Sequence, residues 1–258
     1  MPAIDRAHCP RVEPMGRLEI LYEDNHLLAI NKAAGLPTMG AAAGQASLVE
    51  SAKRYLKQKY RKPGRVYLGV VSRIDAPVTG VVLFARTSKA AARLTEAFRS
   101  RQVSKRYWAL VDSWSAGDEG TLRHALRKDE SRRRMVVCPT SHPQAIQAEL
   151  RFRRLGQVDG AAWLEIDLVT GRKHQIRVQL AAAGGAILGD VRYGSETKSG
   201  RKFSFPHGIA LHARQLELLH PVRREPLVLV APLPTHWPRL PATFRSGNGG
   251  SEGTEGAR

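Results

Sequence analysis

The chain has 258 residues and a formal net charge of +18, from 41 Lys and Arg against 23 Asp and Glu. Its length and its hydrophobic fraction of 42% are those of a globular protein that folds without disulfides or metals, which excludes wholesale disorder. The excess of positive charge predicts a polyanion or an anionic membrane surface as the partner.

The sequence shows neither a membrane span nor a secretion signal. The uncharged segment 178–189 is too short to cross a bilayer, and the N-terminus lacks the basic-then-apolar pattern of a signal peptide. Cys9 and Cys138 lie far apart and match no zinc-binding spacing. We therefore expect a cytoplasmic protein that binds no metal.

Hydrophobic periodicity predicts mostly strands, in chain order after a loose N-terminal arm at 1–17. Two short strands at 18–22 and 26–31 precede a helix from Ser47 to about Lys59, whose capping box pairs Ser47 with Glu50. Further strands are predicted at 66–71, 80–85, 103–111, 145–152, 162–169, 209–219 and 227–230, and further helices at 88–101 and 174–183.

The order of these elements predicts the fold class. Strands outnumber helices and do not alternate strictly with them, which favours an α+β fold with a mixed, largely antiparallel central sheet flanked by helices. We expect one domain over 18–245. The Gly-, Ser- and Glu-rich segment 246–258 is expected to be a disordered tail.

A polar segment, 72–79, separates two apolar strands and contains Arg73 and Asp75. A carboxylate between buried strands is expected to be partly buried, and it stays ionised there only if a cation or several donors hold it. The pattern therefore marks Asp75 as a candidate functional carboxylate. On spacing alone, an ordinary turn with a surface Arg73–Asp75 pair is the alternative.

A second candidate segment, 171–177, follows a strand and opens a helix. Unpaired backbone N–H groups at a helix start bind anions, and Arg172, Lys173 and His174 add side-chain donors at the same place. Cations are unfavourable in the first helical turn, so their presence there favours a function. A solvated basic first turn is the alternative.

Basic runs recur along the chain, with aromatic residues among them. Guanidinium groups bind phosphate and aromatic faces stack on bases, so the runs favour nucleic acid over a set of merely solvated faces. No phosphate-binding glycine motif is present, which argues against a nucleotide cofactor. The runs are 53–65, 99–106, 123–134 and 151–154, and the aromatic residues are Tyr55, Tyr60, Tyr107 and Trp108.

Several ordered motifs carry a family resemblance. They are LYEDNHLLAINKAAGL at 21–36, SRIDAPVTG at 72–80, KRYWALV at 105–111, GRKHQIRV at 171–178, LGDVRYG at 188–194, LHA at 211–213 and HP at 220–221. From about Leu18 to Pro234 they resemble the RluA family of pseudouridine synthases, in particular its single-domain members. The resemblance implies a pseudouridine synthase-like catalytic domain.

The chain departs from the family's usual residues at several positions. Ser72 replaces a His of the catalytic motif, Ala33 replaces a Pro, Val78-Thr79 replace Thr-Ser, and Gln179 replaces a His. None of these departures removes an implied catalytic residue. They bear on the choice of substrate and on efficiency.

The resemblance implies isomerisation of uridine to pseudouridine in structured RNA, either rRNA or tRNA, with the target base flipped out and no cofactor. It implies Asp75 as the nucleophile or stabiliser of a ribosyl cation, Arg177 as its partner, and Tyr107 as the ring that stacks on uracil. We expect a monomer. The expected RNA-binding residues are Arg73, Arg172, Lys173, His174, Lys53, Arg54 and Lys57.

Two alternatives stay open at this point. One is a non-catalytic RNA-binding protein or RNA chaperone of the same fold, and the other is an unrelated basic protein that binds through charge alone. Tritium release from [5-³H]uridine-labelled RNA separates an enzyme from either binder. The presence of Asp75, Tyr107 and Arg177 favours the enzyme.

Overall fold

A computed structural model gives the arrangement of most of the chain. The expected N-terminal arm at 1–17 and tail at 246–258 lie outside the described residues. The structure describes residues 18–40, 46–194, 205 and 207–239.

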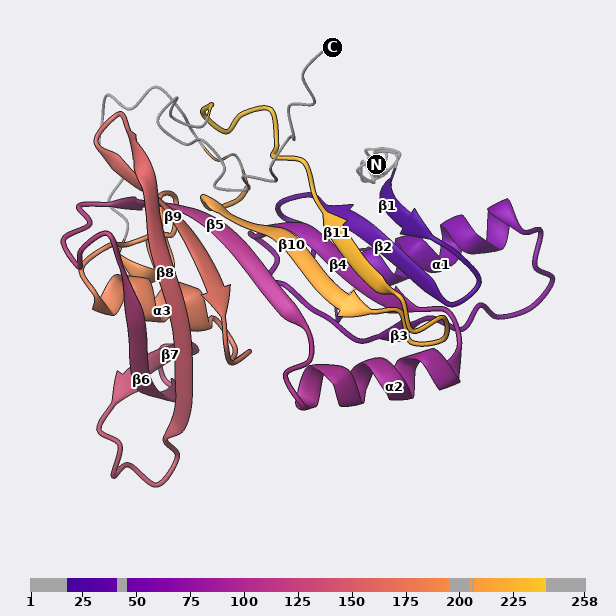
Figure 1. Cartoon of the computed structure of the whole chain (residues 1–258), viewed down its shortest axis with the longest axis horizontal. Helices are drawn as coiled ribbons and strands as arrows, with labels where there is room; N and C mark the ends of the chain where they lie inside the picture. The colour runs from indigo at the N-terminus through magenta and orange to yellow at the C-terminus, as the bar shows by residue number, and fades with distance from the viewer. Residues whose placement is uncertain (1–17, 41–45, 195–204, 206, 240–258) are drawn as a thin grey trace, which may run out of the picture.

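The described residues form one mixed, largely antiparallel sheet, as the sequence predicts, and this sheet has eleven strands (Figure 1). Its strand order is β1-β2-β4-β10-β5-β9-β8-β6-β7, with β11 paired to β10 and β3 paired to β4. All pairs are antiparallel except β4 with β10. The strands are β1 Glu19–Glu23, β2 Leu27–Lys32, β3 Gly69–Val70, β4 Thr79–Ala85, β5 Ser104–Asp112, β6 Glu119–Asp129, β7 Arg134–Cys138, β8 Ile146–Val158, β9 Ala161–Leu168, β10 Leu211–Leu219 and β11 Pro226–Val230.

Three α-helices flank the sheet: α1 Leu48–Lys59, α2 Ser88–Arg99 and α3 Gln175–Ala182. The capping box of α1 is present, because the Glu50 backbone N–H donates to the Ser47 side chain and the Ser47 N–H donates to Glu50. Helix α2 is capped by Thr87, since the Thr87 hydroxyl accepts from the backbone N–H of Ala90.

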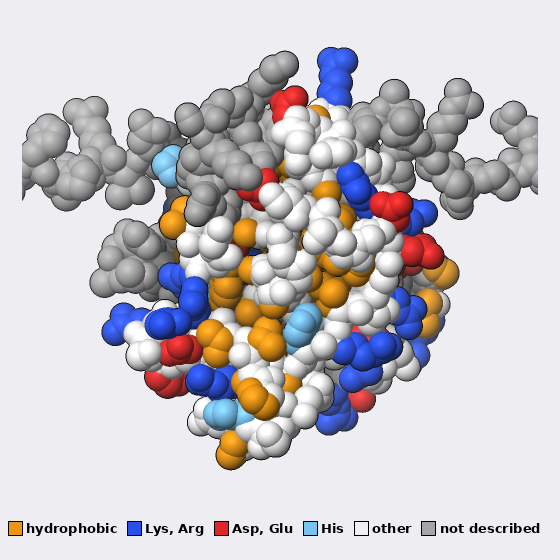
Figure 2. Space-filling model, turned by 90° about the vertical axis from the view of Figure 1, so that its left-hand side faces the viewer, with side chains coloured by type: hydrophobic (Ala, Val, Ile, Leu, Met, Phe, Trp, Pro, Cys, Tyr) orange, Lys and Arg blue, Asp and Glu red, His pale blue; other side chains and the backbone are white. Residues whose placement is uncertain are grey.

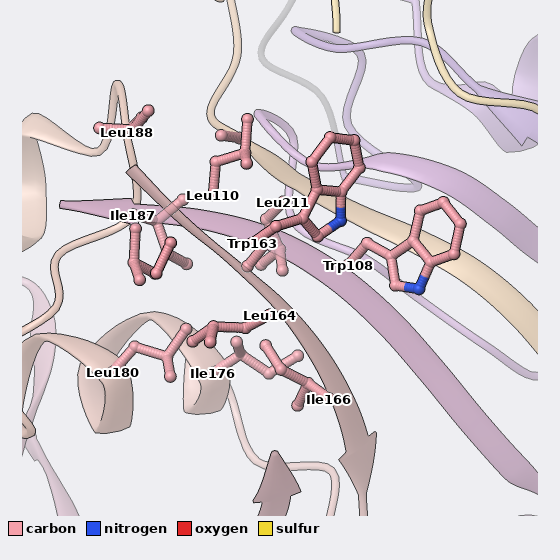
Figure 3. Close-up of a cluster of buried hydrophobic side chains, with 14 of the residues drawn as sticks. Trp108, Leu110, Trp163, Leu164, Ile166, Ile176, Leu180, Ile187, Leu188 and Leu211 are labelled. Atoms are coloured by element: carbon pink, nitrogen blue, oxygen red, sulfur yellow. The ribbon is translucent and has the colours of Figure 1, made fainter. Parts of the chain in front are cut away.

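The largest hydrophobic cluster lies between α3 and the β5–β9 part of the sheet (Figure 3). Trp163 of β9 is fully buried and makes an edge-to-face contact with Trp108 of β5. Ile176 and Leu180 on α3 belong to the same cluster. Each fully buried side chain of this size contributes about 1.5–3 kcal/mol, so this packing fixes α3, and with it Arg177, against the sheet.

The structure corrects the sequence prediction at two places. The expected strand at 66–71 is reduced to β3, because in the antiparallel register that pairs Gly69 with Ala85 the residues 66–68 lie beyond the end of β4. The sequence analysis assigned no strands at 119–138, where β6 and β7 form a hairpin. Their frequent charged residues hide the alternation that buries Leu126 and Met135.

Candidate active site

A cavity of about 890 Å³ lies where the Asp75 loop, the end of α2, β5 and the start of α3 meet. Loops supply part of its wall, and the sheet and the ends of the two helices supply the rest, an arrangement typical of functional sites. Most of the predicted site residues line it, although they are scattered along the sequence. They are Asp75, Tyr107, Arg177, Arg73, Arg172, Lys173 and His174.

Hydrogen bonds that involve backbone groups hold the loop that carries Asp75. The Thr38 hydroxyl donates to the carbonyl oxygen of Ile74 at 2.9 Å, and the Gly35 N–H donates to Ala76 at 2.9 Å. Ser72, which stands where the family usually has His, accepts a hydrogen bond from the Leu83 N–H at 2.7 Å. Ser72 therefore anchors the loop to β4, while the Asp75 side chain keeps 28% of its surface exposed.

Arg177 joins Asp75 to a second, buried carboxylate. Its Nη1 lies 3.0 Å from Asp75 Oδ2, and its Nε and Nη2 lie 2.6 and 2.8 Å from the two oxygens of Asp190. Although burial lowers the pKa of Arg177, its hydrogen bonds and ion pairs with Asp190 and Asp75 raise it above the ordinary value. The bidentate Asp190 pair fixes the plane of the guanidinium, and that plane orients Asp75.

His174 adds a third contact to the Asp75 side chain. Its Nε2 lies 3.7 Å from Asp75 Oδ2, and its Nδ1 lies 2.8 Å from the hydroxyl of Tyr193. Burial lowers the pKa of His174, and Arg177 and Lys173 lower it further, whereas Asp75 acts in the opposite direction. The helix begins one residue later than predicted, at Gln175, because His174 adopts a left-handed conformation at φ 53°.

The expected anion site at the start of α3 is partly filled by the protein itself. The Gln175 side-chain oxygen accepts from the backbone N–H of Arg172 at 2.9 Å and from the hydroxyl of Thr170 at 2.8 Å. The side chains of Arg172 and Lys173 remain exposed at the rim of the cavity. Their charged groups, rather than the helix backbone, are therefore available to an anion.

Tyr107 lies on β5, paired to Ala213 on one side and to Ile166 on the other. Burial raises the pKa of its phenol, and the negative charge of Asp75 raises it further. The ring is thus a neutral aromatic surface with an intact hydroxyl, held by two neighbouring strands beside the carboxylate. Such a surface suits stacking against a base.

Lys32, which the sequence pattern does not single out, lies behind the Asp75 loop and is 1% exposed. Its Nζ donates to the carbonyl oxygens of Ala33, Leu36 and Ala76 at 2.8–2.9 Å. Burial lowers the pKa of Lys32 to about 7, and Asp75 opposes this shift. A charged residue two positions after the apolar run 27–30 was the signal in the sequence.

Asp190 and Tyr193 were quoted in a motif but given no role. Asp190 is 1% exposed, and the Tyr193 ring lies 5.0 Å from the guanidinium of Arg177. The motif that contains them therefore builds the support of Arg177.

The three predicted RNA-binding residues of α1 lie outside the cavity. Lys53, Arg54 and Lys57 line a separate hollow of about 580 Å³ beside 63–66. In the part of the chain that the structure describes, no group of three His, Cys, Asp or Glu residues lies close enough to hold a metal ion. No described helix is long and apolar enough to span a membrane.

Comparisons with known proteins give consistent matches. The family model for RNA pseudouridylate synthase matches residues 26–182. Ribosomal large subunit pseudouridine synthase D of Xylella fastidiosa is 36% identical, over 95% of this chain and 74% of the relative. An uncharacterised RNA pseudouridine synthase of Bacillus subtilis is 31% identical, over 90% of this chain and 74% of the relative.

Solved structures show the same likeness. Human RNA pseudouridylate synthase domain containing 4 superposes with a TM-score of 0.70 at 29% identity, covering 84% of this chain and 89% of the human chain. A second human protein, RNA pseudouridylate synthase domain containing 1, superposes with a TM-score of 0.66 at 25% identity. This second match covers 84% of each chain.

Proposed function

Because the chain belongs to the RNA pseudouridylate synthase family, we propose that this enzyme isomerises uridine in folded ribosomal RNA at the cavity around Asp75. The observation that carries the proposal is the ion pair between Asp75 and Arg177, which lies at a cavity wall and is supported by Asp190. Relatives named for the ribosomal large subunit support the choice of RNA.

The reaction breaks the bond between uracil N1 and ribose C1′ and forms a new bond between C5 and C1′. The C5 hydrogen leaves as a proton, and N1 gains a proton in its place. It needs a negative group at C1′, where positive charge develops as the first bond breaks, but no redox partner. Asp75 supplies that group, as the nucleophile or as a stabiliser of the ribosyl cation. Arg177 balances its charge and fixes its orientation, and the exposed part of the carboxylate faces the substrate.

The target base has to leave its stack before Asp75 can reach C1′. Tyr107 lies beside Asp75 with a neutral ring that stacks on the extruded uracil. Arg73 is exposed at the rim of the cavity and fills the space that the base vacates. Arg172, Lys173 and His174 bind the RNA near the same opening. The enzyme acts as a cytoplasmic monomer in this proposal.

The test is replacement of Asp75 by Ala, with tritium release from [5-³H]uridine-labelled ribosomal RNA of a strain that lacks the gene. Asp75→Ala is expected to abolish release and leave RNA binding nearly intact, because a carboxylate repels phosphate and adds nothing to affinity. Asp118→Asn is the matched control, since Asp118 is 86% exposed and lies outside the cavity lining. Turnover of Asp75→Ala within tenfold of wild type would overturn the assignment.

A further inference from the structure

The cavity has a large excess of positive charge beyond what Asp75 needs. Among the described residues that line it, Asp75 is the only carboxylate, and it already pairs with Arg177. Charge of one sign concentrated in a cleft attracts a polyanion and has to be neutralised when the site is filled. The cationic residues of the lining are Arg73, Arg99, Arg101, Lys105, Arg172, Lys173 and Arg177.

Lys105 differs from the other cations at the rim because it is half-buried on β5. In the part of the chain that the structure describes, its ammonium group makes no hydrogen bond and no ion pair. The next residue, Arg106, points to the other face of the strand and lies 3.1 Å from Asp167 and 3.7 Å from Glu165. Because successive side chains of a strand point to opposite faces, Arg106 has acidic partners and Lys105 has none among the described residues.

The surroundings of Lys105 are those of an anion site. The ammonium lies against the loop before α3, since a Cβ built on Gly171 would be 3.4 Å from Lys105 Nζ. That loop carries Arg172 and Lys173. Burial lowers the pKa of Lys105, and repulsion from Arg101 lowers it further. A half-buried ammonium beside other cations is costly unless an anion joins it.

The position of Lys105 also matches the expected path of the RNA. Lys105 and Tyr107 lie two residues apart on one face of β5, which places their Cα atoms about 7 Å apart. If uracil stacks on Tyr107, the backbone of the same nucleotide or of its neighbour passes within reach of Lys105. Charge-assisted contacts from lysine to phosphate are common in nucleic-acid recognition.

We propose that Lys105 binds a backbone phosphate of the target RNA, either that of the flipped nucleotide or that of the nucleotide next to it. This inference rests on the proposed function for the place of the uracil. It assigns to a further residue of the cavity a part of the RNA binding that the sequence predicts for Arg73, for residues 172–174 and for three cations of α1.

Binding of fluorescein-labelled heptauridylate tests the contact without turnover. Lys105→Met keeps the apolar stem and removes the charge, and we expect about tenfold weaker binding. The slope of log affinity against log salt should fall by about 0.7, the value for one phosphate of a single strand. Lys89→Met, at the far end of α2 and exposed, also removes one charge and should leave both quantities unchanged.

Kinetics and stability separate phosphate binding from a structural role. Lys105→Met should raise the KM for ribosomal RNA more than it lowers kcat, and Lys105→Arg should restore most of the affinity. Thermal melting checks that both variants fold. A Lys105→Met protein that folds and binds heptauridylate with wild-type affinity and salt slope would overturn the proposal. Failure of the proposed function would instead appear as absent tritium release by wild type, with the binding difference intact.

Discussion

The Arg177 guanidinium lies between two carboxylates and is itself 6% exposed. Replacement by Met leaves Asp190, which is 1% exposed, as a buried charge without its partner. Breaking a buried pair in this way costs about 3–5 kcal/mol. Arg177→Met should therefore lose both tritium release and stability, measured as the free energy of unfolding in urea.

A double variant separates the two losses. Arg177→Met with Asp190→Leu removes the stranded charge, so stability should largely return while activity stays lost, because Asp75 still lacks its partner. If Arg177→Met were as stable as wild type, Asp190 would have another source of compensation and the support role of the pair would be wrong.

Lys32 gives the stability a distinct pH dependence. Its pKa is about 7 in the fold against 10.5 for an ordinary lysine, so between these values the unfolded chain holds a proton that the folded chain has released. The free energy of unfolding then rises with pH. Below pH 7 Lys32 is protonated in both the folded and the unfolded chain, and its contribution to the free energy of unfolding stays at its lowest value.

The measurement is the unfolding free energy of wild type minus that of Lys32→Met, from urea titrations between pH 6 and 10. The difference should rise from about pH 7 by at most about 1.4 kcal/mol per pH unit. A flat difference would mean that the three carbonyl acceptors keep the ammonium charged throughout this range.

Single site residues could be predicted from the sequence where the type of side chain alone suggests a function. Asp75 stands out as a carboxylate between apolar runs, and the family resemblance paired it with Arg177, 102 residues away. Lys32 and Lys105 could not be predicted, because their roles depend on what surrounds the ammonium group. Three carbonyl oxygens surround that of Lys32, and no acceptor among the described residues contacts that of Lys105. Residue spacing carries no information on such surroundings.

Among the elements, the parallel contact of β4 with β10 places the Asp75 loop beside β5 and Tyr107. Gly80 permits this contact, since it adopts φ +114° and a Cβ there would overlap the Ala213 backbone. Gly80→Ala should lower the free energy of unfolding by at least about 2 kcal/mol and reduce tritium release.

Gly160→Ala is the matched control for Gly80. Gly160 also has a positive φ, +76°, but no atom lies within 4 Å of a Cβ built there, so the variant carries the backbone strain alone. Gly160→Ala should lower the free energy of unfolding in urea by about 1 kcal/mol and leave tritium release unchanged. If both variants lowered the free energy of unfolding equally, the close approach of β10 to Gly80 would make no contribution to stability.

Periodicity predicted the helices and most strands, since α1 and α2 each present an apolar stripe and β9 alternates Leu164, Ile166 and Leu168 with Glu165 and Asp167. The β6–β7 hairpin was missed because its edge position leaves most side chains in solvent, where charge replaces alternation. The strand predicted at 66–71 was too long for the opposite reason. Val66 and Leu68 pack against the core, but they lie beyond the end of β4 and have no strand partner there.

For the molecule as a whole, the charge of +18 is not gathered in one block. On the face shown in Figure 2, Lys and Arg side chains lie on both flanks of a central hydrophobic and uncharged area. The total predicted an anionic partner, but only the fold shows which cations surround the cavity. The cations of α1 and those of the cavity rim form two separate groups.

This charge predicts strong salt dependence of RNA binding. If six to ten cations neutralise phosphates, affinity should fall about a thousandfold or more between 50 and 200 mM salt, with a gentler slope for single strands. Fluorescence anisotropy with labelled ribosomal RNA fragments measures the slope. A fall of only a few fold would mean that most of the positive charge keeps the protein in solution and does not contact RNA.

The α1 group decides how far the RNA extends beyond the cavity. Replacing Lys53, Arg54 and Lys57 together by Gln should reduce the salt slope by about 2 if all three contact single-stranded phosphates, with the loss appearing in KM. Three cations of the β6–β7 hairpin, Arg127, Arg132 and Arg133, form the comparison variant at the other end of the sheet order. The salt slope of the α1 variant could instead equal that of wild type while the slope of the hairpin variant is reduced. That result would show that the RNA contacts the hairpin and that α1 faces solvent.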